Sequence, residues 1–341
     1  MSKFHDRKLS RRMLLGGAAG GAAALPALHG LVPHQGVHDA LAGGPHGAEA
    51  HRGSAHPGVV GRVDPAVNGF DPHLMLRDFD EGVVSNGVRE WELVAEDKEI
   101  EVAPGVKYAA WTYNGRVPGP TLRAREGERL RINFVNASDH SHTIHFHGIH
   151  RAIHDGVPGI GAGNIEPGES TVYEFDAEPF GLHHYHCHST PLADHIAKGL
   201  YGMFIVDPRQ GRPPADELVM VMNGFDTNFD RTNEVYGVNT VAFAYAQEPI
   251  RVRRGELVRI YLLNILEFDL VNSFHIHANF FDVFPTGTSL EPTELTDTIV
   301  QGQGQRAILE LRFPYEGRYM FHAHVSEFAE LGWMGFFEVE A

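Results

Sequence analysis

The chain has 341 residues, a net charge of −16, 38 glycines, 20 prolines and a single cysteine. One cysteine excludes an intramolecular disulfide, and the acidic balance makes nucleic acid and anionic membrane surfaces poor partners. The length suits two ordinary domains, and the glycine and proline content favours a β protein rich in turns.

Residues 1–30 predict an export signal. A basic region precedes a Gly/Ala-rich apolar run that is too short to span a membrane. The stretch Ser10-Arg11-Arg12, followed by Leu14 and Leu15, resembles a twin-arginine signal. We therefore expect a periplasmic or secreted protein that uses the twin-arginine export machinery and has no membrane span.

Residues 31–86 are predicted to form a flexible linker rich in His, Gly and Ala, followed by an irregular lead-in, because they carry few large apolar side chains. Residues 87–208 predict a first β domain. Residues 129–136 alternate apolar with polar side chains, as a half-buried strand does. The turn signals Asn114-Gly115 and Pro118-Gly119-Pro120 separate such strands.

Residues 215–341 repeat this pattern after a linker near residues 209–214. Residues 254–264 correspond to 126–136, and residues 334–339 correspond to 201–206. Many short strands separated by turn signals are typical of β-sandwiches and barrels. The sequence therefore predicts an all-β protein with two tandem Greek-key domains.

Histidines occur in pairs with one residue between them. Side chains at i and i+2 of a strand lie on one face, so the two imidazoles of a pair can converge on one metal or on neighbouring metals. Imidazole suits copper, zinc, iron and nickel. The four pairs are His145/His147, His186/His188, His275/His277 and His322/His324.

The only cysteine, Cys187, lies between His186 and His188. In an extended strand its thiol points away from the face that the two histidines share. Two imidazoles, one thiolate and a weak axial ligand make a blue-copper site. The backbone of Cys187 would then join such a site to a second metal centre on the opposite face.

The motifs His142-Thr-Ile-His145-Phe-His147 and His186-Cys187-His188, with His195 further on, resemble those of the multicopper oxidases. The resemblance covers about residues 88–341 and is to the two-domain members, which include small laccases and are related to copper nitrite reductases. It implies two cupredoxin-like domains with a type 1 copper in the first only, because Ala323 replaces cysteine in the second.

By this resemblance, four coppers per subunit are expected. The type 1 ligands are His142, Cys187 and His195. Leu200 and Met203 compete for the axial position, and Leu200 is preferred because residues 201–206 align with the strand after the ligand. A non-coordinating axial side chain raises the reduction potential. The resemblance assigns His145 and His275 to the type 2 copper, and to the type 3 pair His147, His186, His188, His277, His322 and His324.

The resemblance also implies a reaction. A small aromatic or metal-ion donor gives up one electron at a time near His195, the electrons pass through Cys187, and the trinuclear cluster reduces dioxygen to water. Asp155 is a candidate proton relay, since this reduction consumes protons. The two-domain members form homotrimers with clusters between subunits, so a homotrimer is expected here.

Three alternatives stay open. A copper nitrite reductase would use one catalytic copper with three histidines, which leaves His145, His188, His277 and His324 unexplained. A cuprous-ion oxidase would favour soft ligands, but the eight methionines are scattered. A copper-storage or electron-transfer protein would not need the paired histidines for electron transfer.

Overall fold

A computed structural model describes residues 61–341. The predicted export signal and the linker up to residue 60 lie outside the described residues. Within residues 61–341 the chain forms many strands and a few short helices, which confirms the all-β prediction. None of the described helices is long and apolar enough to cross a membrane.

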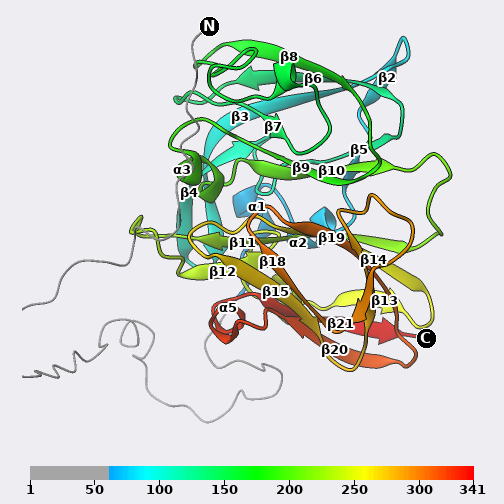
Figure 1. The fold of residues 1–341 in the computed structure, drawn as a ribbon. Helices are drawn as coiled ribbons and strands as arrows, with labels where there is room; N and C mark the ends of the chain where they lie inside the picture. The colour runs from blue at the N-terminus through cyan, green and yellow to red at the C-terminus, as the bar shows by residue number, and fades with distance from the viewer. Residues whose placement is uncertain (1–60) are drawn as a thin grey trace, which may run out of the picture. The chain divides into compact units, whose positions relative to one another are not determined.

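The first sandwich, in cyan and green in Figure 1, contains the strands from β1 to β10. Its strand β6 buries every second side chain, as the alternating sequence predicts. The strands are β1 (Phe79–Asp80), β5 (Thr121–Arg125), β10 (Tyr201–Asp207), β9 (Gly181–His186) and β7 (His145–Phe146) in one sheet, and β2 (Val83–Ser85), β3 (Val88–Ala103), β6 (Arg129–Asn136), β8 (Ser170–Asp176) and β4 (Val106–Tyr113) in the other.

The second sandwich, in yellow to red, repeats the arrangement (Figure 1). One sheet contains β12 (Val235–Val238), β11 (Asp216–Phe225), β14 (Leu257–Asn264), β19 (Arg306–Arg312), β16 (Phe281–Pro285) and β17 (Glu294–Thr296). The other contains β13 (Ile250–Arg253), β21 (Met334–Glu340), β20 (Gly317–His322), β15 (Val271–Ile276) and β18 (Thr298–Gly302).

The helices are short; α1 and α2 precede the first described strand, and the others lie between strands. They are α1 (Pro65–Asn68), α2 (Pro72–Met75), the 3-10 turn η1 (Ala152–His154), α3 (Leu192–Ala197), α4 (Ala244–Gln247) and α5 (Ser326–Glu330).

Residues 61–86, expected as an irregular lead-in, contain the short helices α1 and α2 and the short strands β1 and β2. Asp64 and Asp71 cap α1 and α2, each with proline at the first helical position, a favourable start for a helix. Leu76 is buried in the core of the second sandwich, and its carbonyl accepts a hydrogen bond from Val219 N. The sequence did not predict these helices, because the apolar side chains of residues 61–86 pack against residues far along the chain.

Three apolar cores hold the described chain together. One lies inside each sandwich, and the third joins them. Strand β10 contributes to two cores: Phe204 faces the first sandwich, whereas Met203 and Ile205 face the joint core. A strand buried on both faces must be apolar throughout. The two sandwiches therefore pack as one unit.

Strand register brings the paired histidines together in both sandwiches. His145 on β7 lies opposite His186 on β9, and His275 on β15 lies opposite His322 on β20. The internal repeat predicted from the sequence is therefore present at the level of residue pairing.

Candidate metal centres

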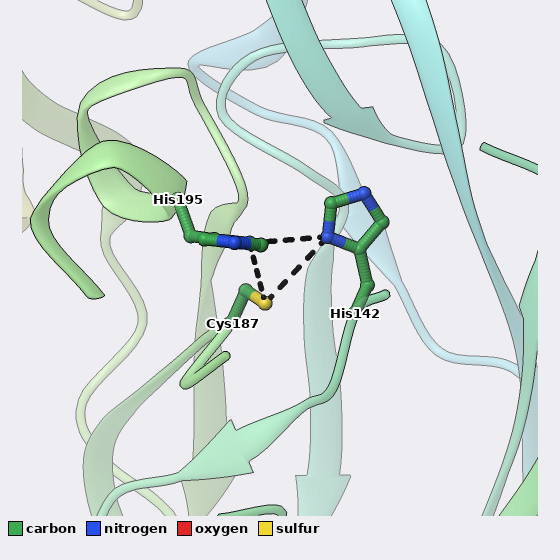
Figure 2. Close-up of side chains that lie close together, drawn as sticks. All are labelled: His142, Cys187 and His195. Atoms are coloured by element: carbon green, nitrogen blue, oxygen red, sulfur yellow. Dashed lines mark hydrogen bonds between the residues drawn. The ribbon is translucent and has the colours of Figure 1, made fainter. Parts of the chain in front are cut away.

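Three buried side chains of the first sandwich converge on one point (Figure 2). His142 lies just before β7, Cys187 just after β9, and His195 on α3. The Nδ1 atoms of His142 and His195 are 3.2 Å apart. Cys187 Sγ lies 3.2 Å from His195 Nδ1 and 3.8 Å from His142 Nδ1. These separations between the three ligand atoms suit a single ion with bonds of about 2.0–2.3 Å, the range of zinc sites with the same ligand types.

The protonation of these groups also suits a metal. Burial lowers the pKa of His142 to about 3, helped by the neighbouring His195, and lowers that of His195 to about 4. Both imidazoles are therefore neutral at ordinary pH and can act as ligands. Burial raises the pKa of the Cys187 thiol, and a coordinated cation reverses this by removing the proton.

Neighbouring groups fix the orientation of the ligands. His142 Nε2 lies 2.8 Å from Ser138 Oγ, which leaves Nδ1 free to face the sulfur. The backbone N–H of Thr143 donates to Cys187 Sγ at 3.3 Å. Hydrogen bonds to the sulfur tune the potential of a copper–thiolate site.

The structure separates the two axial candidates. Cys187 N donates to the carbonyl of Leu200 at 2.9 Å, so the two residues lie opposite one another. Leu200 is fully buried in the same core as Cys187, whereas Met203 points into the joint core between the sandwiches. Of the two, only Leu200 lies on the Cys187 face, as the sequence alignment favoured.

A second group in the first sandwich contains four imidazoles, which we call half-site 1: His145, His147, His186 and His188. The Nε2 atoms of His147 and His186 are 2.9 Å apart. The ring of His145 lies 5.3 Å from that of His186 and 5.4 Å from that of His188. Burial, together with the neighbouring imidazole of His186, lowers the pKa of His147 to about 2, so this imidazole is neutral.

The second sandwich carries the equivalent half-site 2: His275, His277, His322 and His324. The Nε2 atoms of His277 and His322 are 3.1 Å apart. The ring of His275 lies 5.3 Å from those of both His322 and His324. All eight histidines that the sequence assigned to the cluster thus lie in two matching groups, each within a single sandwich.

The same hydrogen bonds orient both half-sites. His186 Nδ1 lies 2.8 Å from the carbonyl of Cys187, and His322 Nδ1 lies 2.6 Å from that of Ala323. A ring N–H that donates to a carbonyl leaves the opposite nitrogen free for a metal and fixes the tautomer. The Nε2 atoms of both rings therefore face the centre of each group.

Asp155 lies beside half-site 1. His145 Nδ1 is 2.8 Å from its backbone carbonyl and 3.2 Å from its carboxylate, which is also 3.5 Å from His150 Nε2. The turn depends on Gly156, which has φ +67°; a Cβ there would lie 1.8 Å from Ile144 O. The carboxylate thus lies within contact distance of both His145 and His150.

Sequence reasoning missed several supporting residues. Thr143 Oγ1 accepts the backbone N–H of His188, and Ser273 Oγ accepts that of His324. The signal was present, because a hydroxyl residue stands two positions before the first histidine in both repeats. Asp297, whose carbonyl lies 2.9 Å from His275 Nδ1, had no such signal, since strand pairing alone brings it there.

The second sandwich lacks the sulfur site. In the first sandwich Cys187 N donates to Leu200 O, and Leu200 N donates to His195 O. In the second sandwich Ala323 N donates to Trp333 O, and Trp333 N donates to Phe328 O. The counterparts of His142, Cys187, His195 and Leu200 are therefore Asn272, Ala323, Phe328 and Trp333. None of these four side chains is a good copper ligand, so only the first sandwich retains a blue-copper donor set.

A buried cysteine sulfur with two imidazoles, together with half-sites of four imidazoles on β-sandwiches, defines a copper-binding redox protein of the cupredoxin type. Two multicopper oxidase family models match residues 94–211 and 212–341. The chain belongs to the multicopper oxidase family.

A solved multicopper oxidase is 62% identical, with a TM-score of 0.81, and the match covers 82% of this chain and 100% of that one. The copper-containing nitrite reductase of Neisseria meningitidis (serogroup A strain) is 31% identical over 249 residues, 67% of this chain. The chain spans 63% of that reductase's length. Laccase-2 of Botryotinia fuckeliana is 31% identical over 258 residues, 64% of this chain and 42% of the laccase.

Proposed function

We propose that the protein is a laccase-like oxidase that couples one-electron oxidation of aromatic donors to the reduction of dioxygen to water. The observation that carries the proposal is the pair of half-sites, which together offer eight imidazoles in a repeated arrangement. The family resemblance implies that eight imidazoles hold three coppers, one of type 2 and two of type 3. A fourth copper fits the sulfur site.

The bound coppers would supply one-electron chemistry and activate dioxygen. His142, Cys187 and His195 would hold the ion that accepts the electron from the donor. Cys187 then offers two routes to half-site 1: its peptide bonds to both neighbouring histidines, and the 2.8 Å contact between its carbonyl and His186 Nδ1. Asp155 orients His145 and relays protons at its carboxylate, because dioxygen reduction consumes four protons.

A complete cluster would need a second copy of the chain, because each group of converging histidines draws on one sandwich only. Exposed apolar side chains near both half-sites support such an interface. Ile153, two residues before Asp155, is 65% exposed, and Val300 on β18 is 64% exposed. We propose a ring-shaped homotrimer in which half-site 1 of one subunit meets half-site 2 of the next.

Two inactive variants provide a test of this arrangement. His145→Ala/His147→Ala removes half-site 1, and His275→Ala/His277→Ala removes half-site 2. Each alone should be inactive. Co-expression should restore about a quarter of the sites, because an interface can then combine one intact half from each chain. No recovery, with mixed oligomers demonstrated by mass spectrometry, would contradict clusters shared between subunits.

Nitrite reduction is the second candidate, favoured by the similarity to nitrite reductases. Copper content separates the two functions. About four coppers per chain in fully loaded protein would support the oxidase, whereas about two would support a type 1 site with a single catalytic copper. In the second case nitrite turnover should exceed oxidation of phenols.

We also propose that the protein acts outside the cytoplasm. The support is the twin-arginine pattern at Arg11-Arg12, and that route exports folded proteins with cofactors in place. Replacing both arginines with lysine should leave the protein inside the cell, as fractionation would detect.

A further inference from the structure

The ligands of the sulfur site have almost no surface of their own. His142 is 0% exposed and His195 is 3% exposed. An electron donor therefore meets the side chains that lie over these imidazoles before it meets the imidazoles. Which side chains lie there determines which donors can react.

Trp111 on β4 lies directly over the site. Its ring centroid is 4.7 Å from that of His195 and 5.2 Å from that of His142. Its ring centroid is also 4.7 Å from that of the exposed His140. The indole is itself partly exposed, so it is the aromatic surface adjacent to the buried ligands.

Lys198 and Phe229 extend this surface. The ammonium of Lys198, at the end of α3, lies 5.2 Å from the Trp111 ring and 4.6 Å from the Phe229 ring, and it donates to Ala109 O at 3.2 Å. Phe229 is 58% exposed and stacks on Tyr108. Phe229 comes from the second sandwich, in the loop between β11 and β12.

The loop that carries Phe229 is held in place by its own hydrogen bonds. The carboxylate of Asp226 accepts the backbone N–H groups of Asp230 and Arg231. The Arg231 guanidinium then lies 3.4 Å from the carboxylate of Asp194, the residue before His195. The second sandwich is thereby connected to the helix that carries a ligand of the first.

We propose that Trp111, Lys198 and Phe229 form an aromatic cover that selects the donor, which rests on the proposed oxidase function. The donors it fits are electron-rich planar aromatic molecules that stack on the exposed ring faces. The ammonium of Lys198 favours such rings through the cation–π interaction. The donor loses one electron to the metal through the cover and releases its phenolic or amine proton to solvent.

Histidine modification tests the cover without depending on activity. In the metal-free full-length protein, diethylpyrocarbonate should modify the exposed His140 and spare His195, as peptide mass spectrometry would show. Trp111→Ala should increase modification of His195 by about tenfold or more, since the exposed imidazole then reacts freely. Trp111→Phe keeps a ring over the site and should preserve protection.

Tyr315→Ala is the matched control, because Tyr315 is 74% exposed and lies in the second sandwich, between β19 and β20. It should leave His195 protected. Equal modification of His195 and His140 in the wild type, or an unchanged pattern in Trp111→Ala, would overturn the cover.

Donor kinetics test the selection. Phe229→Ala should raise the KM for 2,6-dimethoxyphenol by about fivefold, the size of one lost aromatic contact. The kcat/KM for hexacyanoferrate(II), which has no ring to stack, should change by less than about twofold. The visible absorption of the copper–thiolate site should not change, which separates selection from damage to the site.

An equal loss for both donors, or no change for either, would overturn the proposed donor class. A wild-type protein that oxidises neither donor would instead overturn the oxidase and the donor class together. The protection of His195 would still decide whether the cover exists.

Discussion

The two sandwiches present the same imidazole geometry and yet differ in the sulfur site. The distances between ring centroids in half-site 1 nearly equal those between the equivalent rings of half-site 2. The pair that differs most is His145–His147 at 4.8 Å against His275–His277 at 5.1 Å. A half-site depends on strand register, because a shift by one residue would move each histidine to the other face. The sulfur site depends on three single side chains, which substitution removes without disturbing the strands.

The half-sites also differ in burial. His186 is buried in the first sandwich, whereas its counterpart His322 is partly exposed and His277 and His324 are exposed. Half-site 1 is therefore the more preorganised of the two, since its rings are held by packing as well as by hydrogen bonds. Half-site 2 has the larger exposed surface of the two.

The largest expected difference between the sandwiches lies at the cysteine position. Cys187→Ser should abolish the intense visible absorption and reduce donor oxidation at least about 1,000-fold, because no thiolate remains to bind copper or pass electrons. Ala323→Cys should create no second blue site, since Asn272 and Phe328 stand where the imidazoles would be needed. Absorption spectra and donor kinetics measure both; full turnover in Cys187→Ser would contradict the electron route.

The half-sites should be equally necessary. His188→Ala and His324→Ala should each reduce dioxygen consumption at least about 100-fold, the upper range for supporting residues around a metal. The copper–thiolate absorption should survive in both and should bleach with donor under anaerobic conditions. Normal dioxygen consumption in either variant, followed with an oxygen electrode, would remove that histidine from the cluster.

The supporting hydroxyls should act unequally. Thr143→Ala removes the acceptor of the His188 backbone N–H, and Ser273→Ala removes that of the His324 backbone N–H. Each should reduce turnover about tenfold. Only Thr143 also lies near the sulfur, with Oγ1 3.9 Å from Cys187 Sγ. Thr143→Ala should therefore shift the potential of the copper–thiolate site, whereas Ser273→Ala should not. Redox titration of both variants measures this difference in potential.

Acid should weaken the metal-free protein, chiefly in the first sandwich. Burial lowers the pKa of His142 to about 3 and those of His186 and His195 to about 4, from an ordinary 6.5. Between pH 6.5 and pH 4 the unfolded chain therefore binds protons that the folded chain does not, and the free energy of unfolding falls as pH falls.

The melting temperature should drop by about 5 °C or more between pH 7 and pH 4.5. Hydrogen exchange should accelerate first at amides around β7 and β9. A melting temperature that stays constant or rises on acidification would contradict these pKa values.

Much of the site was readable from the sequence because most of its histidines lie on strands or within two residues of a strand end. The i and i+2 spacing of His145/His147 and His275/His277 is a property of extended chain, and the repeat revealed their equivalence. The position of Leu200 followed from the alignment of the strand after it. Ser273 was equally readable but was overlooked, since a lone hydroxyl carries no metal chemistry of its own.

Other features had no local signal. Asp297 reaches His275 only because β18 pairs with β15. Trp111 and Phe229 are ordinary aromatic residues in the sequence, and both contact Lys198 because the two sandwiches pack on a shared core. The short helices of residues 61–86 were missed for the same reason.

The sequence by itself determined the all-β class, the duplication and the candidate metal ligands, because strand periodicity and residue chemistry act over a few neighbouring positions. Only the tertiary structure decided which axial candidate faces the cysteine, which carbonyls orient the imidazoles and which rings cover the ligands. Several of those features depend on contacts between residues far apart in the chain, such as Asp297 with His275 and Trp111 with His195, and the packing of the whole chain sets them.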